Sequence, residues 1–429
     1  MNNGPSTLAP TGKIAPGAWM TAPQTQAVFA ALTAEKAEVR FVGGCVRDAV
    51  CGRSVHDIDI ATTAPPERVV ELLEKAGLRV VPTGIDHGTV TAITDGRSFE
   101  VTSLRVDVET DGRRARVAFT DDWVADAARR DFTINALSST LDGDIYDPFG
   151  GIDDLSRGLV RFVGNARERI EEDVLRLLRY FRFFAHYGRP PADLDALAAC
   201  RALAPKLSGL SGERVRAEML RILLAPEPAD AIVLMRGERV LDHILPEAGD
   251  VGRLRMMGWL ESHALKLPSV GPDALRRLAS LLSNDATGAE KVAARWRLSN
   301  AETARLTTLA ETPRLAFDGL GEDGVRRALR TLGADLVRDL VLLDWAGAAA
   351  IDPHQPRART RAWANTLEAA EAWTSLDFPL KGRDVLALGV AAGPEIGRFL
   401  GAAEAWWDAG GCRADRDACL AKLKALAGR

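Results

Sequence analysis

The chain has 429 residues, which is too long for a single hydrophobic core and indicates about three domains. With 55 basic against 59 acidic residues its net charge is −4, which excludes a globally basic nucleic-acid-binding protein, so RNA would need a local basic surface. The five cysteines are scattered without a C-x-x-C pair, which argues against a disulfide framework and a structural zinc site. The sequence offers no secretory signal and no run of about 20 apolar residues, so we expect a cytoplasmic protein with no membrane contact.

The elements expected in chain order begin with residues 1–20, whose Pro, Gly, Ser, Thr and Asn content predicts disorder. Helical periodicity and short apolar or alternating runs then follow one another. Helices are expected at 21–36 and 65–77, and strands at 39–44, 58–62, 88–93 and 98–104. The fold class predicted is α+β: a small mixed-sheet head (21–150), then an all-helical neck (151–225), body (226–350) and tail (351–429).

Two aspartates stand two residues apart in the sequence D-I-D. On a strand, Asp57 and Asp59 would point to one side while Ile58 and Ile60 face the other. Two ionised carboxylates this close repel each other unless a divalent cation compensates them. A pair of metal ions about 3.5 to 4 Å apart could activate a hydroxyl and clamp nucleotide phosphates. The alternative is a solvated strand edge without chemistry.

A glycine pair stands upstream of these acids, in G-G-C-V-R-D. Gly43 and Gly44 follow an expected strand and precede a helical pattern, so backbone N–H groups there could approach a triphosphate. Arg47 could pair with the same phosphates. A glycine pair alone is a weak signal, but D-x-D downstream of it makes a nucleotide site the favoured interpretation.

These motifs resemble the head of the class II tRNA nucleotidyltransferases and bacterial poly(A) polymerases, within the DNA polymerase beta-like nucleotidyltransferase superfamily. The resemblance implies template-independent addition of CCA to the 3′ end of tRNA from CTP and ATP, with Mg²⁺ held by Asp57 and Asp59. It continues in order through A-R-R-D-F-T-I-N-A-L-S (128–138), the segment at 147–164, E-E-D-V-L-R-L-L-R-Y-F-R-F (171–183) and S-G-E-R-V-R-A-E-M-L-R-I-L-L (211–224).

The segment 171–183 is expected to be one helix, on which Asp173 and Arg176 share a face. A carboxylate accepts from an exocyclic amine and a guanidinium donates to a ring nitrogen, so the two could admit cytosine and adenine and reject uracil and guanine. The alternative is an ordinary ion pair between them. By resemblance, Asp173 and Arg176 contact the base, while Arg179 and Arg182 contribute to the nucleotide pocket.

Other roles follow from the resemblance, each with an alternative. Arg130 is expected at the nucleotide phosphates, with Asp131 ordering the motif. Asn135 either helps to bind the nucleotide or makes a structural hydrogen bond. Glu100 is a candidate third carboxylate for the metals, unless it is simply exposed on an edge strand. The charged, turn-rich segment 106–128 lies where the family has a flexible loop needed for the last addition, and could equally be an ordinary surface loop.

Residues 378–400 resemble a tail segment of bacterial CCA-adding enzymes. Lys381 and Arg383 could there contact RNA phosphate, and the alternative is a helix-turn-helix packing motif without RNA. A second basic feature lies at 157–225, with 13 Lys and Arg against 8 Asp and Glu, an excess of 13 − 8 = 5.

Three rival functions remain open. A poly(A) polymerase shares every head motif but usually carries a basic C-terminal extension, which the sequence does not supply. A partial enzyme would add only CC or only A. An RNA-binding module without catalysis would belong to another class, against which the acids, the glycine pair and the arginines speak. No obligate protein partner is evident.

Overall fold

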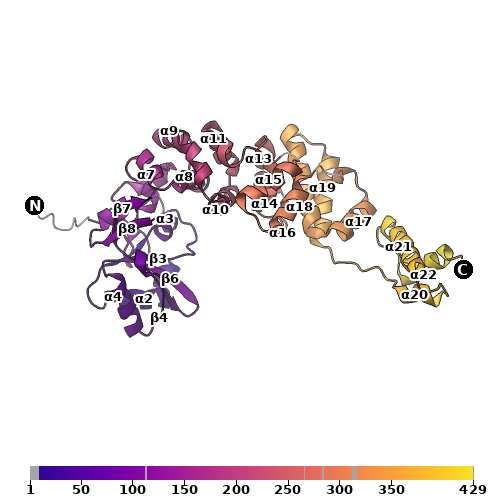
Figure 1. Ribbon diagram of the computed structural model, residues 1–429, viewed down its shortest axis with the longest axis horizontal. Coiled ribbons are helices and arrows are strands. Elements are labelled where there is room, and N and C mark those ends of the chain that lie inside the picture. The colour runs from indigo at the N-terminus through magenta and orange to yellow at the C-terminus, as the bar shows by residue number, and fades with distance from the viewer. Residues whose placement is uncertain (1–8, 112–113, 265, 283–284, 312–315, 429) are drawn as a thin grey trace, which may run out of the picture. The chain divides into compact units, whose positions relative to one another are not determined.

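The computed structural model describes residues 9–111, 114–264, 266–282, 285–311 and 316–428. Their contacts form two compact units, Met1–Glu218 with Leu234–Ile244, and Met219–Val233 with Leu245–Arg429. Strands occupy the indigo to purple part of the chain and helices the remainder (Figure 1), so the predicted α+β class is confirmed. The finer division at 150, 225 and 350 stays a prediction. None of the helices in the described ranges is long and apolar enough to span a bilayer.

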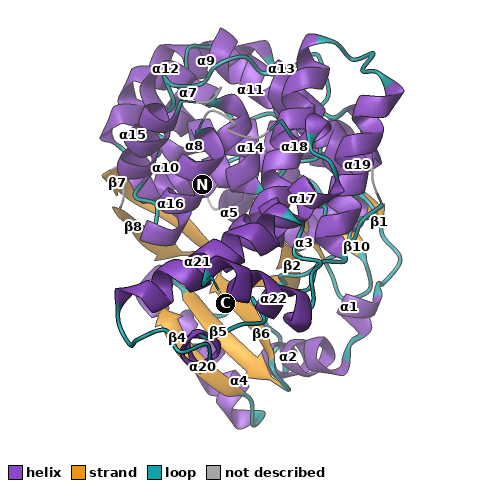
Figure 2. Cartoon of the chain, turned by 90° about the vertical axis from the view of Figure 1, so that its right-hand side faces the viewer, coloured by secondary structure: helices purple, strands orange, loops and turns teal. Residues whose placement is uncertain are grey.

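The strands belong to the first unit. They are β1 Gly12–Lys13, β2 Val39–Val42, β3 Asp59–Thr62, β4 Arg79–Gly84, β5 Thr89–Thr94, β6 Arg97–Ser103, β7 Arg105–Asp111, β8 Arg114–Phe119, β9 Ser138–Ser139 and β10 Asp144–Tyr146. Eight of them form one mixed sheet in the order β1-β10-β9-β2-β3-β6-β5-β4, in which β3 and β6 run parallel. Figure 2 shows β4, β5 and β6 side by side.

The segment expected as a loop at 106–128 contains two strands and a helix among its described residues. Its strands β7 and β8 pair with each other as a separate antiparallel ribbon, and a short helix, α5, follows at Trp123–Ala128. Alternating residues such as those of R-A-R-V-A-F favour strand structure, a signal that the charge of the segment obscured.

The first unit also contains most of the helices that surround the sheet and continue into the neck. They are α1 Ala18–Thr21, α2 Pro23–Thr33, α3 Gly44–Val50, α4 Pro66–Lys75, α6 Gly151–Arg157, α7 Ala166–Glu172, α8 Leu175–Tyr187, α9 Leu194–Leu203 and α12 Leu241–Ile244, with short turns of helix η1 Ile85–His87, η2 Thr133–Asn135 and η3 Ala204–Gly209. Two helices, α10 Gly212–Leu223 and α11 Pro228–Gly237, contribute residues to both units.

The sheet owes its position to apolar side chains on one face. Phe41 of β2 and Ile60 of β3 are fully buried, and they pack in one core with Phe29 of α2 and Val69 of α4. Burying such side chains stabilises the fold by about 1.5 to 3 kcal/mol each. The ends of β2 and β3 are thereby fixed where the glycine pair and the acids lie.

The N-terminal segment differs from its expectation over residues 9–20. Thr11 donates its backbone N–H to Ile145 O at 2.8 Å, and Lys13 forms an ion pair with Asp144 at 3.2 Å. Pairing with β10 supplies the backbone hydrogen bonds that composition alone could not reveal. The expectation of disorder is therefore wrong for residues 9–20, and its part at 1–8 lies outside the described residues.

An aromatic cluster joins the R-R-D segment to α8. The ring of Phe132 lies 4.7 Å from Phe162 and 5.1 Å from Phe183, and Phe162 stacks on Tyr180 at 5.8 Å, each between ring centroids. Three of these rings, those of Phe132, Phe162 and Tyr180, are almost completely buried. Aromatic contacts of this kind fix the orientation of α8 against the head.

The regular elements in the described residues of the second unit are helices, joined by loops, and none of these residues forms a strand. Its elements are α13 Gly252–Trp259, α14 Ala274–Leu281, α15 Ala286–Trp296, α16 Asn300–Ala310, α17 Glu322–Leu332, α18 Ala334–Ile351, α19 Arg357–Glu371, α20 Gly382–Ala387, α21 Pro394–Ala409 and α22 Arg416–Leu426, with the short segments η4 Leu260–Ala264 and η5 Phe317–Gly319.

Candidate active site

Two of the three predicted carboxylates lie on neighbouring strands of the head sheet, and the third lies just before one of these strands. Asp59 is the first residue of β3 and stands directly opposite Glu100 of the parallel strand β6. Asp57 is exposed just before β3, while Ile58 and Ile60 are 7% and 0% exposed. Both β3 and β6 have a neighbour on each side, so neither is an edge strand. Asp57 and Glu100 are nevertheless exposed, so the metal role of these acids stays a prediction beside the alternative of solvated carboxylates.

The electrostatics of Asp59 favour a cation. Burial, and then the charge of Glu100, raise the pKa of the Asp59 carboxyl, and Asp57 adds to this, whereas Arg130 and Arg47 oppose it. Hard divalent cations prefer such carboxylate oxygens, and Mg²⁺ is typically held by one or two of them together with substrate phosphates. Within the described ranges no group of three or more His, Cys, Asp or Glu side chains is placed to hold a metal, so nucleotide oxygens would have to complete the shell.

The glycine turn adopts a backbone that requires glycine. Gly43 has φ 71° and ψ −124° and precedes α3, whose first residue is Gly44. A Cβ on Gly43 would lie 3.0 Å from Nη1 of Arg130. The turn and Arg130 therefore lie against each other, as the predicted phosphate site requires.

We expect Gly43→Ala to weaken nucleotide binding by roughly 10- to 100-fold, since a side chain there displaces Arg130 and the loss of a hydrogen bond between charged groups costs about that much. Gly52→Ala is the matched control, because Gly52 also has a positive φ, of 65°, but has no atom near its Cβ position. Calorimetric titration with CTP and thermal melts of both variants check this. If the two variants had similar melting temperatures and lost CTP affinity equally, Gly43 would have no specific role in nucleotide binding.

A chain of buried hydrogen bonds links the predicted nucleotide residues. Nη1 of Arg47 donates to Oδ1 of Asn135 at 2.6 Å, and Nδ2 of Asn135 donates to Oδ1 of Asp131 at 3.0 Å. The other oxygen of Asp131 accepts from Nε of Arg179 at 2.7 Å. The Asn135 amide is thus used at both ends in a structural hydrogen-bond network, and its nucleotide contact stays a prediction.

Asp131 carries its charge within this network. Burial disfavours the ionised carboxyl, but Arg179 and the Asn135 amide outweigh it and lower the pKa of Asp131. A buried carboxylate needs such partners to stay charged. Asp131 therefore orders the R-R-D segment against α8.

Three of the expected arginines lie over aromatic rings, and one of them is Arg179, whose guanidinium lies 5.5 Å from the Phe183 ring. The guanidinium of Arg47 lies 5.1 Å from the Phe183 ring and 4.4 Å from the Tyr187 ring, and the side chain is buried. That of Arg182 lies 4.6 Å from Phe183, with Nε 3.2 Å from Oε2 of Glu218. The Arg47 contacts join α3 to α8, and the Arg182 ion pair joins α8 to α10. Any phosphate contact by Arg47 would have to be added to its ring contacts.

The expected continuous helix at 171–183 is wrong. It is broken at Asp173, whose backbone is extended (φ −149°, ψ 108°) between α7 and α8. The Asp173 carboxylate accepts from the Leu175 N–H at 3.1 Å, an Asx-type contact that competes with helix continuation.

The two base-selecting candidates have other partners than each other. Both oxygens of Asp173 accept from Nη2 of Arg214, at 3.0 and 2.9 Å. Nη1 of Arg176 donates to Glu172 and, at 3.1 Å, to the Arg169 carbonyl. The alternative of a simple Asp173–Arg176 ion pair is therefore wrong. Sequence reasoning missed Arg214 and Glu172, although both lie within the motifs that carry the resemblance.

The tail candidates lie in the second unit. Lys381 immediately precedes α20, Arg383 is within it, and both are exposed. The Lys381 N–H donates to Asp384 at 2.7 Å, and Asp384 also binds Arg416. The segment is thus a packed helical start that leaves two cations at the surface.

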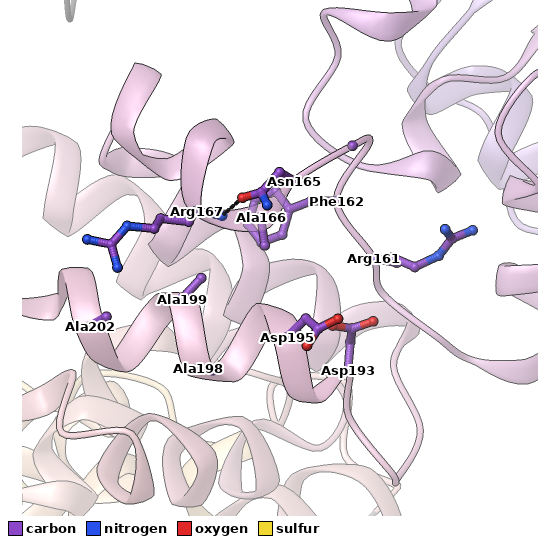
Figure 3. A pocket seen from close by; sticks show the side chains of 11 residues that line it. Arg161, Phe162, Asn165, Ala166, Arg167, Asp193, Asp195, Ala198, Ala199 and Ala202 are labelled. Atoms are coloured by element: carbon purple, nitrogen blue, oxygen red, sulfur yellow. Dashed lines mark hydrogen bonds between the residues drawn. The ribbon is translucent and has the colours of Figure 1, made fainter.

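A separate pocket of about 580 Å³ lies in the neck (Figure 3). Arg161 and Arg167 lie on its opposite sides, with Asp193 and Asp195 at the start of α9. The side chain of Asn165 caps α7 by accepting from the Arg167 N–H at 2.9 Å. None of the residues predicted for the nucleotide site lines this pocket.

A glycine turn and paired acids at the mixed sheet, with the arginine-bearing helix α8 packed against α3 and the R-R-D segment, define a nucleotidyltransferase head. The family description "Poly A polymerase head domain" matches residues 39–161, and "Probable RNA and SrmB- binding site of polymerase A" matches residues 193–250.

Relatives extend over nearly the whole chain. The mitochondrial CCA tRNA nucleotidyltransferase 1 of Danio rerio is 34% identical over 400 residues, which cover 90% of this chain and 87% of that protein. The CCA-adding enzyme of Limosilactobacillus fermentum is 32% identical over 372 residues, covering 85% and 86%. The solved CCA-adding enzyme of Bacillus stearothermophilus in complex with CTP matches with a TM-score of 0.69 and 26% identity, covering 95% and 98%. The chain belongs to the CCA tRNA nucleotidyltransferase family.

Proposed function

We propose that this chain adds C, C and A in turn to the 3′ end of tRNA, consuming CTP and ATP and releasing pyrophosphate without a nucleic-acid template. The observation that carries the proposal is the 34% identity to a CCA tRNA nucleotidyltransferase over 90% of this chain. That similarity includes both the head and the helical part, whereas a shared head alone would fit a poly(A) polymerase equally well.

In each addition the 3′ hydroxyl oxygen of the tRNA attacks the α-phosphorus of the nucleotide. A new P–O bond forms, the bond to the oxygen bridging the α- and β-phosphorus breaks, pyrophosphate leaves and the hydroxyl proton goes to water. Mg²⁺ held by Asp57 and Asp59, with Glu100 as a third candidate, would supply activation of the hydroxyl and neutralisation of phosphate charge. The N–H groups at Gly43 and Gly44 and the guanidinium of Arg130 would orient the triphosphate.

Base choice would rest on Asp173 and Arg176. A carboxylate has about four lone-pair sites, so Asp173 can keep its bond to Arg214 and still accept from the amine of cytosine or adenine. Arg176 has five N–H donors, of which Glu172 and neighbouring carbonyls occupy only part. Their partners hold both groups in a fixed orientation before a nucleotide arrives, which reduces the entropy lost on binding.

Mg²⁺ is expected to stabilise the protein through Asp59. Because the folded-state pKa of Asp59 is raised, its contribution to stability is full at acid pH and is lost as the pH rises through that pKa. A bound cation offsets this loss at neutral pH. At a Mg²⁺ concentration 100 times the Kd, the gain is about 2.7 kcal/mol.

Differential scanning calorimetry at pH 7.5 with and without Mg²⁺ measures this gain. Asp59→Asn should remove most of the Mg²⁺-dependent rise in Tm without lowering the Tm of the metal-free protein. A variant that responds to Mg²⁺ as the wild type does would place the cation elsewhere.

The function is tested with the purified full chain, Mg²⁺, each nucleotide alone and in mixture, and tRNA lacking CCA beside a generic RNA of equal length. Three added nucleotides of sequence CCA on tRNA alone support the proposal. Long A tails on either RNA would instead identify a poly(A) polymerase, and addition that stops after CC, or adds only A, a partial enzyme.

The residues that contact tRNA and the cellular compartment of the reaction are also proposals. Exposed Lys381 and Arg383 would contact tRNA phosphates, since contacts to the backbone position RNA without reading sequence. We infer the cytoplasm as the place of action, although the vertebrate relatives are named as mitochondrial.

A further inference from the structure

One buried carboxylate on α5 binds three groups at once. Asp126 is 3% exposed, and its Oδ1 accepts from the backbone N–H of Arg105 at 3.2 Å and from Nε of Arg129 at 2.9 Å. Its Oδ2 accepts from Nη2 of Arg130 at 3.3 Å. Asp126 therefore connects the first residue of β7 to both arginines of the R-R-D segment.

The guanidinium of Arg130 is held between this carboxylate and the glycine turn. Its Nη1 donates to the Asn135 carbonyl at 3.4 Å and lies 3.0 Å from the position that a Cβ on Gly43 would take. The direction in which Arg130 presents its remaining N–H groups thus depends on Asp126.

The base of the β7–β8 ribbon is fixed beside the same group. The Thr120 N–H donates to the Leu104 carbonyl at 2.9 Å, and the Leu104 N–H donates to Thr62 O at 2.9 Å at the end of β3. The Asp122 side chain then caps α5. Both ends of the ribbon therefore meet next to the strand that carries Asp59.

The start of α5 is clamped to the head sheet. Nε1 of Trp123 donates to Oε2 of Glu38 at 2.8 Å, and the guanidinium of Arg40 lies 4.2 Å from the Trp123 ring and 3.6 Å from the Tyr146 ring. Stacking on two rings and a shared carboxylate leave α5 little freedom to turn. Asp126 is therefore held on a rigid support.

We propose that Asp126 is a positioning residue for the incoming nucleotide. Its carboxylate orients the Arg130 guanidinium toward the phosphates at the Gly43 turn, and its bond to the Arg105 N–H couples this orientation to the first residue of the β7–β8 ribbon. The proposal rests on the proposed function, because it takes Arg130 as a phosphate ligand.

The charge of Asp126 is part of this role. Burial disfavours its ionised form, but Arg130 and Arg129 outweigh burial and lower the pKa of the carboxyl. Asp126→Asn keeps an oxygen for the Arg105 N–H while it removes the charge that holds the two guanidinium groups.

We expect Asp126→Asn to raise the KM for CTP in the first addition by about 10- to 100-fold with a much smaller change in kcat, because a misdirected Arg130 loses a charge-assisted hydrogen bond to phosphate that is made equally in the bound substrate and in the transition state. Asp122→Asn is the matched control: it removes one acidic charge at the start of α5 but keeps the Oδ1 that accepts from the N–H groups of Val124 and Ala125, so Tm and KM should both stay near those of the wild type.

A double-mutant cycle with Arg130→Ala separates a positioning role from a structural one. If Asp126 acts through Arg130, the double variant should be no worse than Arg130→Ala alone. Fully additive losses, or a KM for Asp126→Asn equal to that of Asp122→Asn, would overturn the proposal.

Asp126→Glu keeps the test decisive if Asp126→Asn does not fold. It retains the charge but shifts it by one methylene, so KM should still rise at a near-normal Tm, and wild-type KM would overturn the proposal. Calorimetric titration of the same variants with CTP measures the contribution of Arg130 to nucleotide affinity without any turnover. If the wild-type protein added no nucleotide to tRNA, the proposed function would be refuted, but the effect of Asp126 on CTP affinity could still be measured.

Discussion

Asp59→Asn should reduce nucleotide addition by more than 100-fold while tRNA binding is retained. Removing a residue that only hydrogen-bonds to a metal ligand already lowers metal affinity or activity by about 10- to 100-fold, and removing a direct ligand should lower it further. Asp57→Asn should act alike, since Asp57 lies two residues before Asp59 and its charge acts on the Asp59 carboxyl. Single-turnover assays with labelled tRNA measure the chemistry, and gel shifts measure binding.

Asp142→Asn provides the control for the change of charge. Asp142 is exposed in the turn between β9 and β10, so its loss alters the net charge without touching the site. Turnover by Asp57→Asn or Asp59→Asn at the rate of Asp142→Asn would show that the chemistry does not depend on these acids.

Reversing the base-selecting pair, Asp173→Arg with Arg176→Asp, should let UTP or GTP enter. Hydrogen-bonding sites reach about 10⁴- to 10⁵-fold discrimination because a wrong base leaves buried polar groups unpaired, and the reversed pair would impose that penalty on CTP and ATP instead. Incorporation of each nucleotide into tRNA lacking CCA, in separate reactions, gives the selectivity directly.

The structure adds a condition to this experiment. In the reversed protein the arginine introduced at position 173 would face Arg214, and the aspartate introduced at position 176 would face Glu172. Like charges so close together destabilise a site. A companion variant that also carries Arg214→Glu and Glu172→Arg restores these two ion pairs, at the cost of the pair that Glu172 forms with Arg169. If that folded variant still takes only CTP and ATP, base choice lies elsewhere.

Much of the head could be predicted from the sequence because local patterns determine it. Alternation of apolar and polar residues placed β2, β3, β5 and β6 within one or two residues, and the glycine pair marked the start of α3. Alternation also placed Ile58 and Ile60 away from the acids, as burial confirms.

Features that depend on distant segments could not be predicted. Glu100 lies beside Asp59, and not on an edge strand, because β3 and β6 pair in parallel. These two strands are far apart along the chain, so local patterns do not predict their pairing. The break at Asp173 likewise follows from partners such as Arg214 that lie on another helix. Periodicity alone favoured an unbroken helix there.

The buried network around the nucleotide arginines shows the same limit. Asn135 and Asp131 were named from one motif, but their hydrogen bonds reach Arg47 and Arg179 in others. Only a folded chain reveals whether such groups face a ligand or each other.

A crystal of the wild-type protein with CTP and Mn²⁺ in place of Mg²⁺, measured at the manganese absorption edge, would test the chemistry and the base choice together. We predict an anomalous peak bound by Asp57 and Asp59 and by phosphate oxygens, with the cytosine edge hydrogen-bonded to Asp173 and Arg176. A peak away from these aspartates, or a base that contacts neither side chain, would contradict the proposed site.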